Sequence, residues 1–159
     1  MSQVCMTPIT GPKAWRGETL ARETSWIVTL TDAELADIDR AVATAKASGL
    51  PLERIQREHF PLTVARAKLE QAVTEMYAGR GFVVLRGLPG RRYSDDDVGL
   101  IFWGFGRYMG APLYQNPQGD LLGHVYDHGR TYGQIDVRGY ETDAYLPYHT
   151  DAGDVVGLL

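Results

Sequence analysis

The pattern of apolar residues changes once along this chain, at Gly110, and this change limits the folds that the chain can form. Before Gly110, apolar residues recur at helical spacing in three segments, which start near Thr31, Pro61 and Ser94. After it, residues 111–159 are rich in Gly, Tyr, Val and Asp, with turn residues every few positions, a texture typical of short strands. Helices followed by strands predict an α+β protein.

The helix predicted after Thr31 has the clearest start signal. Thr31 and Glu34 have the spacing of a capping box, in which each side chain accepts a hydrogen bond from the backbone N–H of the other residue. Gly49 and Pro51 then end the helix. A second helix is predicted to start near Pro61. In both helices we interpret the apolar stripe as core packing rather than a cofactor site. The stripe of the first comprises Leu35, Ile38, Val42 and Ala45, and that of the second comprises Val64, Leu69, Ala72, Val73 and Met76.

A short strand and a third helix are predicted next. The run "GFVVLRGLP", residues 81–89, is apolar, β-branched and bounded by turn residues, which indicates a buried strand. Ser94 caps the following helix, and Asp95–Asp97 lie in its first turn, where the helix dipole favours negative charge. We therefore interpret this acidic run as structural. Gly104 and Gly106 lie inside the helix, and no strand comes directly before them, as a phosphate-binding loop would require. They therefore predict close helix packing rather than a phosphate loop.

The N-terminal segment differs from the rest of the chain. Residues 1–30 mix Pro and Gly with Trp15 and Trp26, and we expect an extended arm whose tryptophans anchor it to the body. Residues 31–159 are then expected to form the domain itself. The only cysteine is Cys5, so no internal disulfide can form, which favours a reducing compartment such as the cytoplasm.

The charge of the chain bears on its partners. The 159 residues carry a formal net charge of −4 and no basic cluster. Nucleic acid and anionic membranes favour a basic face, so neither is expected as the main partner. No segment is apolar and long enough to span a membrane. The oligomeric state is left open.

Two possible metal ligands, His149 and Asp151, stand one residue apart in "LPYHTDAGDVVGLL". In a strand, residues at i and i+2 project to the same face, so the imidazole and the carboxylate would point the same way. These groups supply two of the three ligands in a 2-His-1-carboxylate iron site. A surface pair of His149 with Asp151 or Asp154, in a turn, is the alternative on these residues alone.

A second histidine cluster lies upstream. His124 and His128 resemble the inverted zinc-protease pattern H-x-x-E-H, with Asp127 in place of the glutamate. That chemistry needs both histidines on one helical face, and the surrounding glycines disfavour a helix. We expect instead that His124 lies on a strand, near the pocket that would bind a substrate, and that His128 lies in a turn. His59 is expected to be an exposed bystander.

The order of these segments resembles a known family. "GFVVLRGLP", then "GDLLGHVYD", then "RGYETDAYLPYHTDAGDVVGLL" are similar to the N-terminal half of the TauD/TfdA (taurine dioxygenase-like) family, over about residues 60–159. The resemblance implies Fe(II)- and 2-oxoglutarate-dependent oxygenases with a double-stranded β-helix (jelly-roll, clavaminate synthase-like) core. It implies that N-terminal helices flank the beginning of this core, which is incomplete in this chain.

The resemblance also assigns roles to residues. His149 and Asp151 would bind Fe(II) and serve catalysis, while the second iron histidine and the arginine that binds 2-oxoglutarate would lie further downstream. Tyr145, Tyr148, His124 and Asn116 are candidates for the substrate pocket; no residue is assigned to 2-oxoglutarate.

The expected activity is hydroxylation of a small organic substrate with O2, coupled to oxidative decarboxylation of 2-oxoglutarate to succinate and CO2. That activity is expected of a full-length parent protein, and the 159-residue chain alone is expected to be inactive. The alternative is an inactive fragment that acts at most as a weak metal-binding or partner-binding module.

Overall fold

The computed structural model describes residues 6–126, 129–131, 133, 135, 137, 139, 142–145, 147–151 and 153–159. It divides into two compact units, Met1–Ala111 and Pro112–Leu159. The helices and strands of the described residues all belong to the first unit. The boundary that the sequence suggested between residues 30 and 31 stays a prediction.

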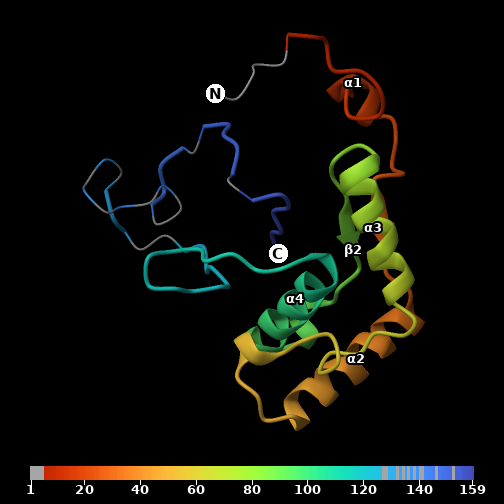
Figure 1. Ribbon diagram of the computed structural model, residues 1–159, viewed down its shortest axis with the longest axis vertical. Coiled ribbons are helices and arrows are strands. Elements are labelled where there is room, and N and C mark those ends of the chain that lie inside the picture. Colours follow the sequence, from red (N-terminus) through yellow and green to blue (C-terminus); the bar gives the residue numbers. More distant parts are fainter. Residues whose placement is uncertain are drawn as a thin grey trace. The chain divides into compact units, whose positions relative to one another are not determined.

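The first unit is an α+β arrangement, as the sequence predicted (Figure 1). Its elements follow the order α1 (Gly17–Leu20), β1 (Ile27–Thr29), α2 (Asp32–Ala47), the 3-10 turn η1 (Leu52–Arg54), α3 (Arg66–Ala78), β2 (Val84–Arg86), the 3-10 turn η2 (Gly90–Arg92) and α4 (Asp95–Met109). Within the part of the chain that the structure describes, no helix is both long and apolar enough to cross a membrane.

The two strands pair in parallel, with Ile27 opposite Val84 and Thr29 opposite Arg86. Parallel strands need a long crossover, and here α2 and α3 provide it. The strand predicted in residues 81–89 is therefore present, but it is not buried, because Val84 is 39% exposed. A sheet of only two strands leaves much of each strand uncovered. β1 is an addition to the prediction, because it forms inside the expected N-terminal arm.

The capping box at the start of α2 is confirmed. The N–H of Glu34 lies 3.4 Å from Oγ1 of Thr31, and Oε2 of Glu34 accepts a 2.7 Å hydrogen bond from the N–H of Thr31. Lys68 on α3 also donates to Oε2 of Glu34, at 2.6 Å, and to the carbonyl of Thr29. The cap therefore joins α2 to α3 and to the end of β1.

α3 begins at Arg66, later than the predicted start near Pro61. Just before it, Oδ2 of the buried Asp37 on α2 accepts hydrogen bonds from the N–H groups of Thr63, Val64 and Ala65. The N–H groups at a helix start have no acceptor within the helix, and Asp37 supplies one at the start of α3. Val64, which the sequence placed in the apolar stripe, lies before α3 and is 46% exposed.

α4 packs against both α2 and α3. Ser94 caps it, as predicted, with Oγ 3.2 Å from the N–H of Asp97. Gly104 lies against the ring of Phe60, so the predicted close packing is correct there, whereas nothing crowds the exposed Gly106. Asp97 pairs with Lys46 at 2.8 Å, in agreement with a structural role for the acidic run. The buried apolar core comprises Leu30, Ile38, Ala41, Val42, Ala45, Ile55, Phe60, Leu62, Ala65, Leu69, Ala72, Ile101, Trp103 and Phe105.

The second unit corrects the strand prediction for residues 111–159. Its described residues form turns, bends and irregular segments, and none of them lies in a strand. Val125 and Tyr126, which lie in a segment expected to form a strand, are 64% and 58% exposed. A strand is stable only when it pairs with another strand and packs on a covering layer. The described residues of this unit therefore have a composition typical of strands but do not pair as strands.

Candidate metal centre

His149 and Asp151 lie together on an irregular segment of the second unit. Nε2 of His149 is 3.6 Å from Oδ1 of Asp151, and both side chains are about half exposed. The strand that was expected to align them is not present at residues 147–151. The spacing of two residues is enough to place the two side chains side by side in this irregular backbone.

A backbone carbonyl orients the imidazole. Nδ1 of His149 lies 2.9 Å from the carbonyl oxygen of Pro147. A carbonyl only accepts hydrogen bonds, so this contact favours the tautomer with the proton on Nδ1. The lone pair then resides on Nε2, the atom that faces Asp151. Metal-binding histidines commonly have their second ring nitrogen held in this way.

The donor pair fits a divalent metal in part. An imidazole nitrogen and a carboxylate oxygen bound to one ion at about 2.1 Å and at right angles would stand about 3.0 Å apart. The observed 3.6 Å between Nε2 and Oδ1 is somewhat wider, and exposed side chains can close that difference by small rotations. Among the described residues, no group of three or more His, Cys, Asp or Glu side chains could hold an ion.

The same two residues can also form an ordinary ion pair. If the ring of His149 is protonated on both nitrogens, the 3.6 Å contact with Asp151 becomes a salt bridge on the surface. Exposed pairs of this kind contribute little to stability, typically about 0–1 kcal/mol. The geometry therefore suits either a metal-binding pair or a weak surface pair, and the surface pair with Asp154 is not among the ion pairs of the described residues.

Two of the pocket candidates have other partners. Asn116 closes a turn, because its Nδ2 donates to Oδ2 of Asp120 at 2.6 Å and its Oδ1 accepts from the N–H of Asp120 at 3.0 Å. His124 stacks on Tyr126, with ring centroids 5.9 Å apart and an interplanar angle of 3°. In the described part of the chain, no hydrogen bond or ring contact joins Asn116 or His124 to His149.

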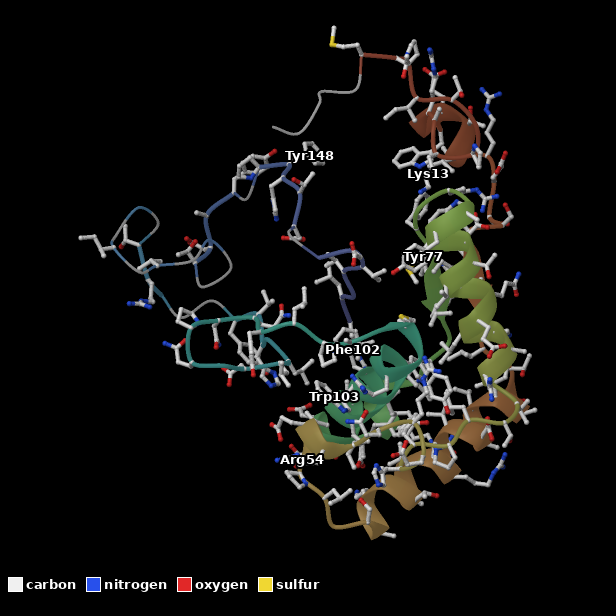
Figure 2. The ribbon with its side chains drawn as sticks, in the orientation of Figure 1. Lys13, Arg54, Tyr77, Phe102, Trp103 and Tyr148 are labelled. Carbon is white, nitrogen blue, oxygen red and sulfur yellow. The ribbon has the colours of Figure 1, made fainter. Side chains whose placement is uncertain are left out.

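The tyrosines flank the pair in sequence and are open to solvent. Tyr145 is 80% exposed and Tyr148 is fully exposed, and Figure 2 shows Tyr148 on the segment that leads to His149. Neither ring packs against another described aromatic residue. Their expected contact with a substrate stays a prediction.

The zinc-protease alternative does not fit the structure. It requires a helix through His124, but Gly123–Tyr126 is irregular, so the helical face that it needs is absent there. His124 is also not on a strand, contrary to the expectation for it. His128 and Asp127 lie outside the described residues.

Sequence reasoning missed two roles that the structure shows. The carbonyl of Pro147 holds the imidazole of His149, and nothing in a sequence marks it, since every residue carries a carbonyl. His59 was expected to be an exposed bystander, but its ring is partly buried and Nδ1 accepts a 3.1 Å hydrogen bond from the N–H of Gln56. The signal for His59 was its position three residues after Gln56 in a short turn.

Comparison with known proteins gives two curated relatives. FR-33289 synthase of Streptomyces rubellomurinus is 28% identical over 162 residues, which cover 100% of this chain and 47% of that protein. Taurine hydroxylase-like protein SAT17 of Stachybotrys chartarum is 28% identical over 152 residues, covering 91% of this chain and 40% of that protein. The chain thus spans less than half the length of these relatives, and no family model matches it. The resemblance to taurine dioxygenase-like proteins that the sequence indicated is confirmed by these similarities.

Proposed function

We propose that this chain is part of an Fe(II)- and 2-oxoglutarate-dependent dioxygenase that hydroxylates a small organic molecule. The reaction would consume O2 and convert 2-oxoglutarate to succinate and CO2. The observation that carries the proposal is the approach of Nε2 of His149 to Oδ1 of Asp151, in a chain similar over 91% of its length to a taurine hydroxylase-like protein. The second unit would be the beginning of a jelly-roll core.

Each residue of the pair has a distinct part in this proposal. Asp151 supplies a hard anionic oxygen and His149 a neutral nitrogen, the two donor types that suit non-haem Fe(II). The carbonyl of Pro147 favours the tautomer of His149 with the proton on Nδ1, in which the lone pair of Nε2 is available to bind a metal. Bound Fe(II) would supply the oxidising chemistry and the positions for 2-oxoglutarate and O2. A third protein ligand would have to come from residues other than those described.

The name of one relative suggests the first substrate to test. That relative is called taurine hydroxylase-like, and taurine is a small zwitterion with an ammonium group and a sulfonate. The net charge of −4 gives this chain no general attraction for anions, so a sulfonate would need specific cationic or N–H donors. We therefore propose a small substrate of the taurine type.

A second candidate function is metal binding without turnover. It is favoured by the finding that the described residues contribute two donors, and no third, to any metal site. Two protein ligands leave most coordination positions to water, so binding by such a pair would be weak and readily reversed.

An assay of turnover separates these two functions. The full-length protein that would contain this chain is incubated with Fe(II), 2-oxoglutarate, O2 and taurine, and succinate and any product one oxygen atom heavier are measured by mass spectrometry. Succinate formation that depends on Fe(II) and is lost in His149→Ala supports the dioxygenase. The variant Asp154→Asn is the matched control, because it removes a nearby exposed carboxylate that does not pair with His149.

Two results of this assay would contradict the proposal. Fe(II) binding by His149 and Asp151 without succinate, with or without taurine, would favour metal binding alone. Unchanged succinate formation in both His149→Ala and Asp151→Asn would remove the pair from the reaction.

A further inference from the structure

Arg80, which follows α3, makes several polar contacts with the N-terminal segment. Its guanidinium donates to Oγ of Ser25 at 2.7 Å and approaches Oε2 of Glu23 at 3.7 Å. On its other side it binds Oε1 of Glu75, at the end of α3, at 3.0 Å. The carbonyl of Arg80 also accepts a 3.1 Å hydrogen bond from Nε1 of Trp15. One residue therefore holds the segment at three places in its length.

Aromatic contacts meet at the same place. The ring of Phe82 lies between two tryptophans, with its centroid 5.3 Å from that of Trp15 and 5.8 Å from that of Trp26. Aromatic pairs at such distances are worth about 0.5–1.5 kcal/mol each beyond their buried area. Arg80 and Phe82 are neighbours in sequence, so the polar and the aromatic attachments form one small docking point.

Among the described residues, few other contacts hold this segment in place. Residues 13–25 are exposed apart from the partly buried Leu20, and α1 is a single turn that buries no residue. A one-turn helix is unstable in isolation, because the free-energy cost of nucleating a helix exceeds the stabilisation from the hydrogen bonds of a single turn. The segment joins the sheet only at Trp26, whose carbonyl accepts the N–H of Val84.

We propose that residues 13–26 form a strap that opens as one unit while α2, α3 and α4 stay folded, and that the side chain of Arg80 is its latch. This inference is independent of the proposed enzymatic function. A segment opens locally as one unit when it has few buried contacts and is held at one small set of neighbouring residues. The strap meets both conditions. Because the latch includes ion pairs of partly exposed groups, salt weakens it and favours the open strap.

Limited trypsin digestion tests the latch, since Lys13, Arg16 and Arg22 are cleavage sites inside the strap. When opening is faster than cleavage, the cleavage rate reports the population of the open form. In Arg80→Ala, we expect cleavage at these three sites to be about tenfold faster, the factor that corresponds to a loss of about 1.4 kcal/mol. Arg80→Lys keeps the charge but not the planar fork, and is expected to fall between Arg80→Ala and the wild type.

The matched control is Arg66→Ala, which removes an exposed ion pair with Glu70 elsewhere on α3. It should leave strap cleavage unchanged. The urea midpoint, followed by far-ultraviolet circular dichroism, should be nearly the same for Arg80→Ala and the control. Equal strap cleavage in Arg80→Ala and wild type would overturn the proposal. So would faster cleavage that is matched by a fall in the urea midpoint, since the whole unit would then be unfolding.

Discussion

The carboxylate of Asp37 on α2 accepts a 3.0 Å hydrogen bond from the backbone N–H of Ala65, the N-cap residue of α3. Ala65 has no side chain that could cap the helix itself. Asp37 takes over this task from another helix, and it also accepts the N–H groups of Thr63 and Val64. A buried carboxylate on three donors at a helix start is favoured by both the hydrogen bonds and the helix dipole.

Replacing Asp37 by Ala should destabilise the first unit by about 3 kcal/mol, because three backbone N–H groups would lose their acceptor. Urea unfolding followed by circular dichroism measures the change. Asp32→Ala is the control, since Asp32 is exposed in the first turn of the same helix. A loss for Asp37→Ala no larger than for Asp32→Ala would mean that the carboxylate does not hold α3.

The stability of the unit should also fall at acidic pH because of Asp37. Burial raises the pKa of this carboxyl, but the hydrogen bonds from Ala65, Thr63 and Val64 outweigh burial and lower the pKa from 3.8 to about 2. A lowered folded-state pKa gives stability that is complete above pH 3.8 and is lost as the pH falls towards 2. This shift corresponds to about 2 kcal/mol.

The measurement is the free energy of unfolding as a function of pH, in wild type and in Asp37→Asn. Glu34 and Asp97 add to the same trend: the pKa of Glu34 is lowered because hydrogen bonds from Lys68 and Thr31 outweigh its burial, and that of Asp97 is lowered chiefly by Lys46. Asp37→Asn should therefore flatten the curve between pH 4 and 2 without making it level. A variant curve parallel to that of the wild type would contradict the assignment to Asp37.

The two glycines of α4 should respond in opposite ways to alanine. A Cβ at Gly104 would lie 2.5 Å from Cδ1 of Phe60, which is fully buried and cannot move aside, so Gly104→Ala should cost about 1–3 kcal/mol. At Gly106 nothing lies within 4 Å, so Gly106→Ala should stabilise the helix by up to about 1 kcal/mol. Thermal unfolding of both variants measures the difference. Equal effects at the two positions would mean that Gly104 is not a packing contact.

Tyr108 ties the end of α4 to the segment before α3. Its hydroxyl accepts a 2.8 Å hydrogen bond from the N–H of Leu62 and donates to the carbonyl of Phe60 at 3.1 Å. Tyr108→Phe should therefore lower the free energy of unfolding by about 1–3 kcal/mol. Tyr77→Phe, at a side chain 53% exposed, is the control and should change little in the same urea titration. If the two variants unfold alike, the hydroxyl of Tyr108 is not a tie.

Local signals in the sequence predicted the helices well. The capping box of Thr31 and Glu34 and the cap by Ser94 involve residues three apart, so both could be derived without knowing the fold. The start of α3 could not, because its cap is Asp37, a residue of another helix. β1 is three residues long and exists only through its pairing with β2, which no local pattern records.

The same distinction applies to the candidate site. His149 and Asp151 lie two residues apart, and their proximity follows from the chain itself. The strand expected to carry them depends on neighbours that the described residues do not supply. The packing that would turn Tyr145 and Tyr148 into a pocket is likewise non-local.

Removal of either member of the pair should weaken metal binding. Because each would supply a direct ligand, His149→Ala and Asp151→Asn should each reduce the affinity for Fe(II), or for Co(II) as its spectroscopic substitute, by about 100-fold or more. The d–d absorption of Co(II) during anaerobic titration reports the bound ion directly. Asp154→Asn, which removes one negative charge nearby without removing a partner of His149, should bind as the wild type does. Equal losses in Asp151→Asn and Asp154→Asn would show that general charge, and not ligation by Asp151, attracts the ion.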